Sequence, residues 1–450
     1  MMIVFFIVVV DLLGFGIVLP LLPVTGEEYL RPLFPGDESK AIRGALIGLL
    51  IATFSAMQFF FAPMWGRLSD RFGRRPILLV GLVGSVLFYA LFGYAAGIGN
   101  PDPNAALDPR DAELAFILMF VARTCAGLAG ATISTAQAVI ADCTPPEKRK
   151  HGMAMIGAAF GIAFTFGPMV GALAMYLAPH GRAATSYTGY VASFLSGVAL
   201  ILALAMLRET RFLPFAKTTE REQTDTAALG EMASFEAAPP ARRRIFNLSA
   251  WRWALGNASI GPVILTFFLA TIGFGAFEST LALLIRDILG LDKEHAYWIF
   301  AYVGFILVLT QGFLYRKLAK TLSEVILMTA GIILMAVGVI GLAGVSLLKT
   351  TDLSSGGILM ATMMFVLAVA VVGFAFLTPS AQALVSRRTS AERQGEILGV
   401  NQSASALARI LGPILGNTLY SLTPTHMLPY LFGAGLLLLM LPLIPRVARG

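Results

Sequence analysis

The chain has 450 residues, of which 57% are hydrophobic and only 13% are charged, and its mean hydropathy is +0.78. Soluble domains carry about 25% charged residues, so this composition excludes a soluble globular protein and indicates several membrane spans. The formal net charge of +7 does not indicate nucleic-acid binding, because the basic residues lie mainly in one alternate set of loops. Cys125 and Cys143 fall within or at the inner end of one span, which predicts free thiols and no disulfide.

Twelve apolar stretches are long enough to cross a hydrocarbon core of about 30 Å as helices. They lie near 2–23, 43–65, 77–98, 113–141, 152–177, 188–207, 256–286, 294–315, 324–347, 356–385, 396–421 and 427–445. The connecting segments on one side hold 23 Lys and Arg residues, and those on the other side hold 8. This asymmetry predicts a multi-pass protein of the inner membrane with both termini in the cytoplasm. The first stretch has no basic n-region, which favours a retained span over a cleaved signal peptide.

An internal repeat divides the chain into two halves. A shift of 245 residues aligns Gly167-Pro168-x-x-Gly171 with Gly412-Pro413-x-x-Gly416, and Ala136-Gln137-Ala138 with Ala381-Gln382-Ala383. We therefore predict an all-α membrane protein with two pseudosymmetric six-helix bundles, residues 1–207 and 256–450. The polar segment 208–255 is predicted to be a cytoplasmic linker, either solvated or with an amphipathic piece on the inner leaflet.

Four ionisable side chains fall inside the predicted spans: Asp11, Arg123, Glu278 and Arg409. A charge in lipid is costly unless it is paired or faces water, so each marks a candidate functional site. Asp11 lies about ten residues into its span, and Arg123 lies about ten residues into another from the opposite face. Both depths reach the midplane, so we predict that this pair faces a common cavity and interacts directly or through water. A static ion pair that holds helices in register is the alternative.

A short basic stretch, residues 66–76, connects the second and third spans. We expect a tight turn there, because Gly66 and Gly73 permit backbone reversal and Pro76 suits the first turn of a helix. Its order, Gly-x-Leu-Ser-Asp-Arg-x-Gly-Arg-Arg, closely resembles the signature between the second and third helices of the major facilitator superfamily. The alternative is a basic loop whose charges only fix the orientation of the chain in the membrane.

Three further stretches resemble signatures of this superfamily. Arg123-x-x-x-Gly127-x-x-Gly130-Ala131 is similar to the pattern of the fourth helix, although Ala126 stands where glutamine is common. Gly167-Pro168-x-x-Gly171 resembles the antiporter signature of the fifth helix, with alanine at two of its glycine positions. Leu13-Gly14 followed by Pro20-Leu21-Leu22-Pro23 fits the first helix of twelve-helix drug:proton antiporters. Together these patterns look like bacterial tetracycline-efflux transporters.

The resemblance implies the fold, the activity and several residue roles. It implies proton coupling at Arg123, and the carboxylates inside the spans, Asp11 and Glu278, are our candidates to carry the proton. The arginine keeps its proton and changes the proton affinity of a neighbouring carboxylate. A conformational latch is implied at the basic stretch and the end of the fourth span: Gly66, Asp70, Arg71, Gly73, Arg74 and Asp142. We expect Asp70 to reach residues 395–398 only when the cytoplasmic side is closed, and Arg71 and Arg74 to hold Asp70 or reach Asp142.

Polar side chains within the spans are expected to shape a substrate cavity. Besides Asp11, Arg123 and Arg409, the candidates are the amides Gln58, Gln137, Gln311, Gln382, Asn401 and Gln402. Amides bond donors or acceptors, which suits a polar drug. Any one of the 32 phenylalanines is expected to face lipid or pack against other helices.

These observations predict a proton-driven exporter of small amphiphilic compounds that works by alternating access. A transporter of a physiological solute, such as a sugar, siderophore or lipid, is the alternative on the same fold. A transport-dead receptor is disfavoured, because it would need no titrating carboxylate such as Asp11 or Glu278. We expect a monomer whose partners are substrate, protons and the bilayer, with no enzymatic activity, cofactor, metal or nucleic acid.

Overall fold

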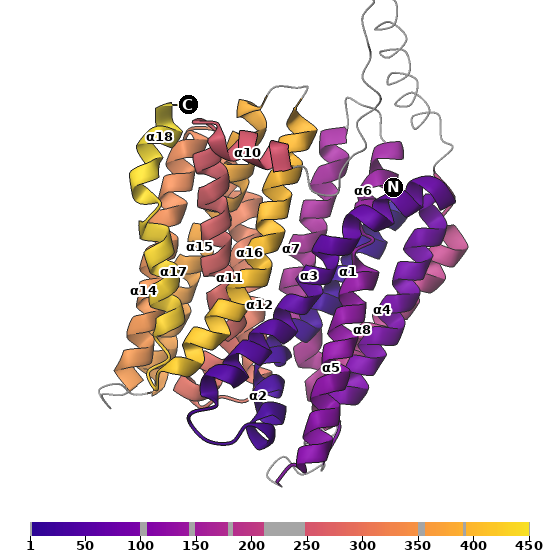
Figure 1. The fold of residues 1–450 in the computed structure, drawn as a ribbon, viewed down its shortest axis with the longest axis vertical. Coiled ribbons are helices and arrows are strands. Elements are labelled where there is room, and N and C mark those ends of the chain that lie inside the picture. The colour runs from indigo at the N-terminus through magenta and orange to yellow at the C-terminus, as the bar shows by residue number, and fades with distance from the viewer. Residues whose placement is uncertain are drawn as a thin grey trace, which may run out of the picture.

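The computed structural model describes residues 2–99, 106–143, 149–178, 183–210, 248–349, 356–389 and 393–449. Every regular element in these ranges is a helix, and the helices form two bundles that lie side by side in Figure 1. The N-terminal bundle is drawn from indigo to magenta, and the C-terminal bundle from salmon to yellow. Both chain ends lie at the same end of the bundles, which we call the basic face; the opposite end is the far face.

The N-terminal bundle contains six spans. Its elements are α1 (Met2–Val18), η1 (Leu19–Leu21), α2 (Leu22–Leu33), α3 (Lys40–Phe72), α4 (Arg74–Ala96), α5 (Pro109–Gly130), α6 (Ile133–Asp142), α7 (Arg149–Leu177) and α8 (Ala183–Met206). The first span combines α1, η1 and α2, and the fourth combines α5 and α6.

The C-terminal bundle follows the same plan. Its elements are α10 (Leu248–Gly256), α11 (Gly261–Leu289), α12 (Lys293–Leu309), the π-helical η3 (Thr310–Tyr315), α13 (Arg316–Leu318), α14 (Glu324–Lys349), α15 (Gly356–Arg388), α16 (Gln394–Leu422), α17 (Leu428–Leu438), η4 (Leu441–Leu443) and α18 (Ile444–Arg449). The short α10 occupies the last part of the predicted linker, whose residues 211–247 lie outside the described ranges.

The predicted spans agree with the helices. Nine helices of the described chain are long and apolar enough to cross a membrane, and 161–177 and 428–443 are shorter apolar helices. The remaining span is α16, whose 29 residues include polar side chains such as Asn401 and Asn417. Each bundle thus supplies six spans, and each of the twelve predicted spans coincides with helical structure apart from short turns such as 257–260.

The first span is longer than predicted. The expected helix ended at 23, whereas helical structure continues through η1 and α2 to Leu33. Prolines do not stop it, because Pro20 lies in the 3₁₀ turn and Pro23 is the second residue of α2, where a missing N–H costs little. Asp11 therefore lies in the first third of the span Val4–Leu33, between the basic face and the midpoint of the span.

The predicted turn at 66–76 is also shorter than expected. Helix α3 continues through Gly66 to Phe72, and α4 begins at Arg74, so Gly73 alone reverses the chain. Its φ of +105° is a conformation that glycine adopts at little cost. Gly66 is an ordinary helical residue, and its predicted role in the turn is wrong.

The two bundles contact each other mainly through two helix pairs, α3 with α16 and α7 with α12, and smaller contacts join α11 and α12 to the first span. Small residues allow the backbones to approach closely. A Cβ atom on Gly48 would lie 2.5 Å from the Cα atom of Ile414, and one on Gly304 would lie 2.5 Å from the carbonyl oxygen of Phe164. Gly48 lies in the first part of α3, toward the far face.

Candidate functional site

A pocket lies between the bundles, with a volume of about 500 Å³ that includes its open mouth. Residues from both halves line it. Phe164 and Pro168 come from α7, whereas Phe274, Phe300 and Phe374 come from α11, α12 and α15. The rings of Phe274 and Phe374 are stacked, with centroids 3.7 Å apart and planes at 14°. The pocket is therefore mostly apolar and aromatic, as sites for drug-sized ligands usually are.

Glu278 is the charged residue among those lining this pocket. Its side chain is half-buried and makes no hydrogen bond or ion pair with any described residue. Arg409 on α16 is near enough for an electrostatic interaction with Glu278, yet it is exposed, and its Nη1 lies 3.4 Å from Ser405 Oγ. A carboxylate with no protein partner in an aromatic pocket can take up either a proton or a polar group of a ligand.

The three residues of the Gly-Pro-x-x-Gly stretch on α7 have three different contacts. Gly167 packs α7 against α1, because a Cβ there would lie 2.8 Å from the Cα atom of Gly16. Pro168 lines the pocket. Gly171 accommodates Tyr297 from the other bundle, since a Cβ would lie 2.3 Å from Cε1 of that ring. The stretch thus joins a helix contact within one half, the pocket wall and a contact between halves.

Tyr297 closes the far face. Its side chain is fully buried against Leu21 and Met175 of the N-terminal bundle, and its hydroxyl donates a 2.8 Å hydrogen bond to the carbonyl oxygen of Ile17. One helical turn earlier, Lys293 Nζ forms a 2.7 Å ion pair with Glu28 on α2. The first turn of α12 therefore fastens the C-terminal bundle to the N-terminal bundle at the far face.

The predicted pair of Asp11 and Arg123 is not formed. Asp11 accepts a 2.6 Å hydrogen bond from the Ser85 hydroxyl and lines a separate small pocket with residues of α4 and α6. The prediction fails because it placed both residues at the midplane, whereas the longer first span leaves Asp11 nearer the basic face than Arg123. The buried Tyr89 is within electrostatic range of both side chains.

Arg123 is 1% exposed, and none of its three guanidinium nitrogens has a hydrogen-bond partner in the described structure. The guanidinium carbon lies 4.6 Å from the ring centroid of Phe54 and 5.5 Å from that of Phe15. Cation–π contacts of this kind stabilise a desolvated arginine by about 2 kcal/mol or more. Phe15 also makes an edge contact with Phe164, so the aromatic shell of Arg123 adjoins the pocket between the bundles.

None of the six predicted amide candidates lines the pocket that holds Glu278. Gln58 donates a 3.3 Å hydrogen bond to the carbonyl oxygen of Gly130, and Asn401 is 3% exposed. Gln311 lies in the π-helical turn, and the other three, Gln137, Gln382 and Gln402, are exposed. The analysis of the sequence missed the phenylalanines of the pocket. One signal was available: Phe274 stands between Gly273 and Gly275, as Phe15 stands between two glycines in the first span.

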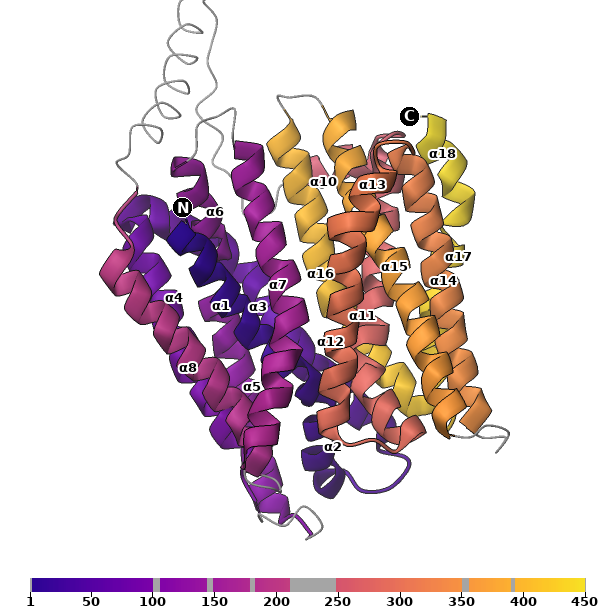
Figure 2. The same ribbon diagram turned by 180° about the vertical axis from the view of Figure 1, so that it is seen from behind.

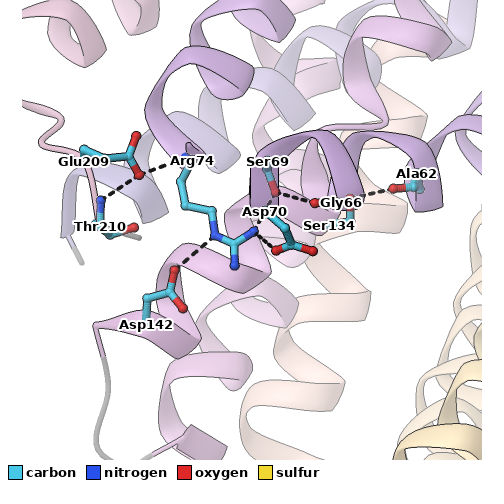
Figure 3. A network of polar contacts seen from close by, with 9 residues as sticks. All are labelled: Ala62, Gly66, Ser69, Asp70, Arg74, Ser134, Asp142, Glu209 and Thr210. Atoms are coloured by element: carbon cyan, nitrogen blue, oxygen red, sulfur yellow. Dashed lines mark hydrogen bonds and ion pairs between the residues drawn. The ribbon is translucent and has the colours of Figure 1, made fainter. Parts of the chain in front are cut away.

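Figure 3 shows the network around the turn at Gly73. The Arg74 guanidinium forms an ion pair with Asp70 and donates 3.1 Å and 2.7 Å hydrogen bonds to Asp142 and to the Ser69 hydroxyl. Arg74 thus makes both contacts proposed for the arginines of this stretch, while Arg71 lies over the Phe72 ring. Burial raises the pKa of the Asp142 carboxyl, and the contact with Arg74 opposes this increase.

Glu209, directly after α8, is a member of this network that the sequence did not indicate. Its carboxylate accepts hydrogen bonds from the backbone amides of Arg74 and Arg75, at 2.8 Å and 3.0 Å. These are free amides of the first turn of α4, where a carboxylate also interacts favourably with the helix dipole. Glu209 therefore caps α4 and fixes the geometry of the turn at Gly73.

Asp70 remains 65% exposed, and it makes no hydrogen bond or ion pair with Ile397 or Leu398, the residues of the predicted contact whose side chains are described. The proposed latch belongs to the opposite state, so we expect Asp70→Asn to increase the population that is open at the basic face and to reduce transport. Spin labels at Arg67 and Lys320, both exposed on this side of the two bundles, report the distance. An unchanged distance distribution with normal transport would show that the stretch only fixes topology.

A second prediction concerns Asp11. We expect Asp11→Asn to reduce proton-driven export strongly while the affinity for substrate stays unchanged, because Asp11 lies in a different pocket from Glu278. Equilibrium binding to the purified variant and transport into vesicles separate the two effects. Normal transport in this variant would remove Asp11 from the proton pathway.

Comparisons with known proteins agree with this geometry. A family model of the Major Facilitator Superfamily matches residues 4–371 and, in a second match, residues 263–449. Two six-helix bundles with a pocket between them define a membrane transporter and not an enzyme. The chain belongs to the Major Facilitator Superfamily.

Individual relatives extend over nearly the whole chain. The class C tetracycline resistance protein of Escherichia coli is 27% identical over 452 residues, which cover 98% of this chain and 95% of that protein. A crystal structure of the human organic anion transporter MFSD10 has a TM-score of 0.60 at 24% identity and covers 98% of both chains. The xylose transporter XylE from E. coli, in a partially occluded inward-open conformation, has a TM-score of 0.68 at 16% identity and covers 98% and 96%.

Proposed function

We propose that this transporter is a proton-coupled antiporter that exports small amphiphilic compounds. The observation that carries the proposal is the aromatic pocket between the bundles, in which the Glu278 carboxylate makes no hydrogen bond or ion pair with a described residue. The neighbouring Pro168 belongs to the stretch that resembles the antiporter signature. An apolar pocket with one acidic group suits an amphiphile that carries a hydrogen-bond donor or a positive charge.

We assign the basic face to the cytoplasm of a cell with this protein in its inner membrane. The distribution of Lys and Arg supports this orientation, because positive residues favour the cytoplasmic side of membrane proteins. On this assignment Tyr297 and the Lys293–Glu28 ion pair close the transporter on the outside. The cytoplasmic segment between the bundles then links two units, 1–207 and 256–450, that move against each other as one monomer.

In the proposed cycle, substrate enters the pocket from the cytoplasm while Glu278 gives up its proton. The substrate then occupies the position next to the carboxylate, and the bundles rock so that the far face opens. A proton from outside neutralises Glu278, which weakens its attraction for the substrate and favours release. Asp11 and Arg123 act in the same cycle, since each is an ionisable group inside a span of the N-terminal bundle, Asp11 partly and Arg123 fully buried.

Transport into inverted membrane vesicles tests the proposal. A panel with tetracycline, an amphiphilic cation and a sugar is offered with and without an imposed proton gradient. We expect accumulation of tetracycline or of the cation only when the gradient is present, and its collapse after addition of a protonophore. Accumulation of the amphiphiles that does not depend on the gradient would refute proton-coupled antiport.

A second candidate function is the export of organic anions. The exposed Arg409 near Glu278 favours it, as does the similarity to a structure whose name is that of an organic anion transporter. The two candidates differ in the effect of Arg409→Gln. Anion export requires the arginine, so this variant loses transport of a fluorescent anion, whereas export of cationic or neutral amphiphiles persists. A sugar or another physiological solute remains the alternative if neither class is transported.

A further inference from the structure

Helix α10 lies across the spans and not along them. In Figure 1 it crosses the basic end of the C-terminal bundle in front of the other helices, and in Figure 2 it lies behind them. It contacts α11 and α16. A nine-residue helix in this position lies at the depth where the spans of the C-terminal bundle leave the membrane.

Local chemistry fixes the angle between α10 and α11. The side-chain oxygen of Asn257 accepts hydrogen bonds from the backbone amides of Ser259 and Ile260, at 2.9 Å and 3.1 Å. Arg388 at the end of α15 donates a 2.8 Å hydrogen bond to the carbonyl oxygen of Ser259. A Cβ on Gly261 would lie 2.4 Å from the carbonyl oxygen of Leu255, so the turn is tightly packed. The orientation of α10 is therefore built into the fold.

The two faces of α10 differ. Ala254 is fully buried, and Trp251 packs against the core of the C-terminal bundle. The other face exposes Arg252, 37% of Trp253 and 49% of Leu255. Arg252 makes no ion pair with a described residue. A tryptophan, a leucine and an arginine on one exposed face are typical of a helix at the membrane interface.

A second arginine joins this face from another element. Arg393 begins α16, and its guanidinium carbon lies 4.2 Å from the centroid of the Trp253 ring. The ring thus lies beside one guanidinium group and follows Arg252 directly in sequence. Arginine binds phosphate oxygens through two parallel N–H groups, and two arginines flanking an exposed indole match the charge and depth of a phospholipid headgroup.

We propose that α10 and Arg393 form a binding surface for the headgroups of anionic phospholipids in the cytoplasmic leaflet. The phosphate lies between Arg252 and Arg393, while Trp253 and Leu255 contact the start of the acyl chains. The proposal rests on the assignment of the basic face to the cytoplasm. It is independent of what the pocket transports, so its test can fail while the transport experiment succeeds. Each arginine near an anionic surface enriches such lipids roughly fivefold.

The test uses the full-length chain in lipid nanodiscs. Trp65→Phe, Trp251→Phe and Trp298→Phe leave Trp253 as the single tryptophan of the four in the chain. Its fluorescence is measured with phosphatidylcholine nanodiscs that contain a small fraction of brominated phosphatidylglycerol or of brominated phosphatidylcholine. We expect stronger quenching by the brominated phosphatidylglycerol. The difference is expected to vanish in Arg252→Gln/Arg393→Gln and to persist in Arg387→Gln, an exposed control that pairs with Glu324 away from α10.

A second measurement needs no tryptophan substitutions. Native mass spectrometry counts the phosphatidylglycerol molecules that the otherwise unchanged chain retains after extraction. We expect Arg252→Gln/Arg393→Gln to retain fewer than the chain with only Arg387→Gln. Equal quenching by the two lipids, no quenching by either, or equal retention in both variants would overturn the proposal.

Discussion

Glu278→Gln is expected to abolish proton-driven export while the chain still folds and binds substrate. Glutamine keeps the shape of the side chain and its hydrogen-bonding capacity but cannot exchange a proton at neutral pH. The pocket that contains Glu278 has no other charged residue in its lining, so no neighbour there takes over the role. We expect the gradient-driven rate to fall by about 100-fold or more, as for the loss of a group that must give and take a proton.

The control is Glu113→Gln, which removes an exposed carboxylate at the start of α5 without touching the pocket. Initial rates of transport into inverted vesicles are compared at equal amounts of membrane-inserted protein. Substrate exchange without a gradient should survive in Glu278→Gln, because exchange needs no net proton movement. Gradient-driven transport at the normal rate in Glu278→Gln would move the proton site elsewhere.

Gly171→Ala is expected to open the far face. The added methyl group would lie 2.3 Å from Cε1 of Tyr297, whose side chain is fully buried. We expect Tyr297 to withdraw to relieve this overlap, which also weakens the neighbouring Lys293–Glu28 ion pair. Overpacking of this kind costs about 1–3 kcal/mol, which corresponds to a change of roughly 5–150-fold in the ratio of the two states.

Spin labels at Arg110 and His295, exposed residues near the far ends of the two bundles, measure the opening. Gly197→Ala is the matched control, because a Cβ there meets no atom within 4 Å. Tyr297→Phe should give a smaller shift in the same direction, since it removes the hydrogen bond to Ile17 but keeps the packing. An unchanged far-face distance in Gly171→Ala would mean that Tyr297 does not hold this side closed.

Most of the fold could be predicted from the sequence because hydrophobic length and loop charge act locally. A helix in lipid must satisfy its own backbone hydrogen bonds, so an apolar run of about 20 residues leaves few alternatives. The ends of the helices could be predicted less accurately. In the sequence alone, charged residues such as Glu27 and Arg31 indicate a loop. Helix α2 nevertheless continues through them, in part because Arg43 forms a 3.3 Å ion pair with Glu27.

The candidate site could be predicted only in part, because a site depends on rotation and depth as well as on position in the sequence. Glu278 could be predicted as a candidate because it is an ionisable residue inside a predicted span. Phe274 and Phe374 carried no comparable signal, since phenylalanine faces lipid, core or cavity with the same sequence pattern. Counting residues from the end of a span misplaced Asp11, because ten residues of helix at the far end, 24–33, were assigned to a loop.

The network at the turn at Gly73 could also be predicted only in part from the sequence. The sequence indicated the turn, the basic charge and the ion pair between Arg74 and Asp70. It did not indicate Glu209, because that residue lies 135 positions from Arg74 and reaches it only through the packing of α8 against α4. Contacts between distant segments become visible when the helices are placed next to each other.

If substrate and proton use the same carboxylate, substrate binding must displace a proton from the purified protein. Purified protein in weakly buffered solution with a pH indicator receives saturating substrate. We expect the wild-type chain to release protons in proportion to the substrate bound, and the Glu278→Gln variant to bind substrate without releasing any. Equal proton release by the two proteins would show that the released proton comes from a group other than Glu278.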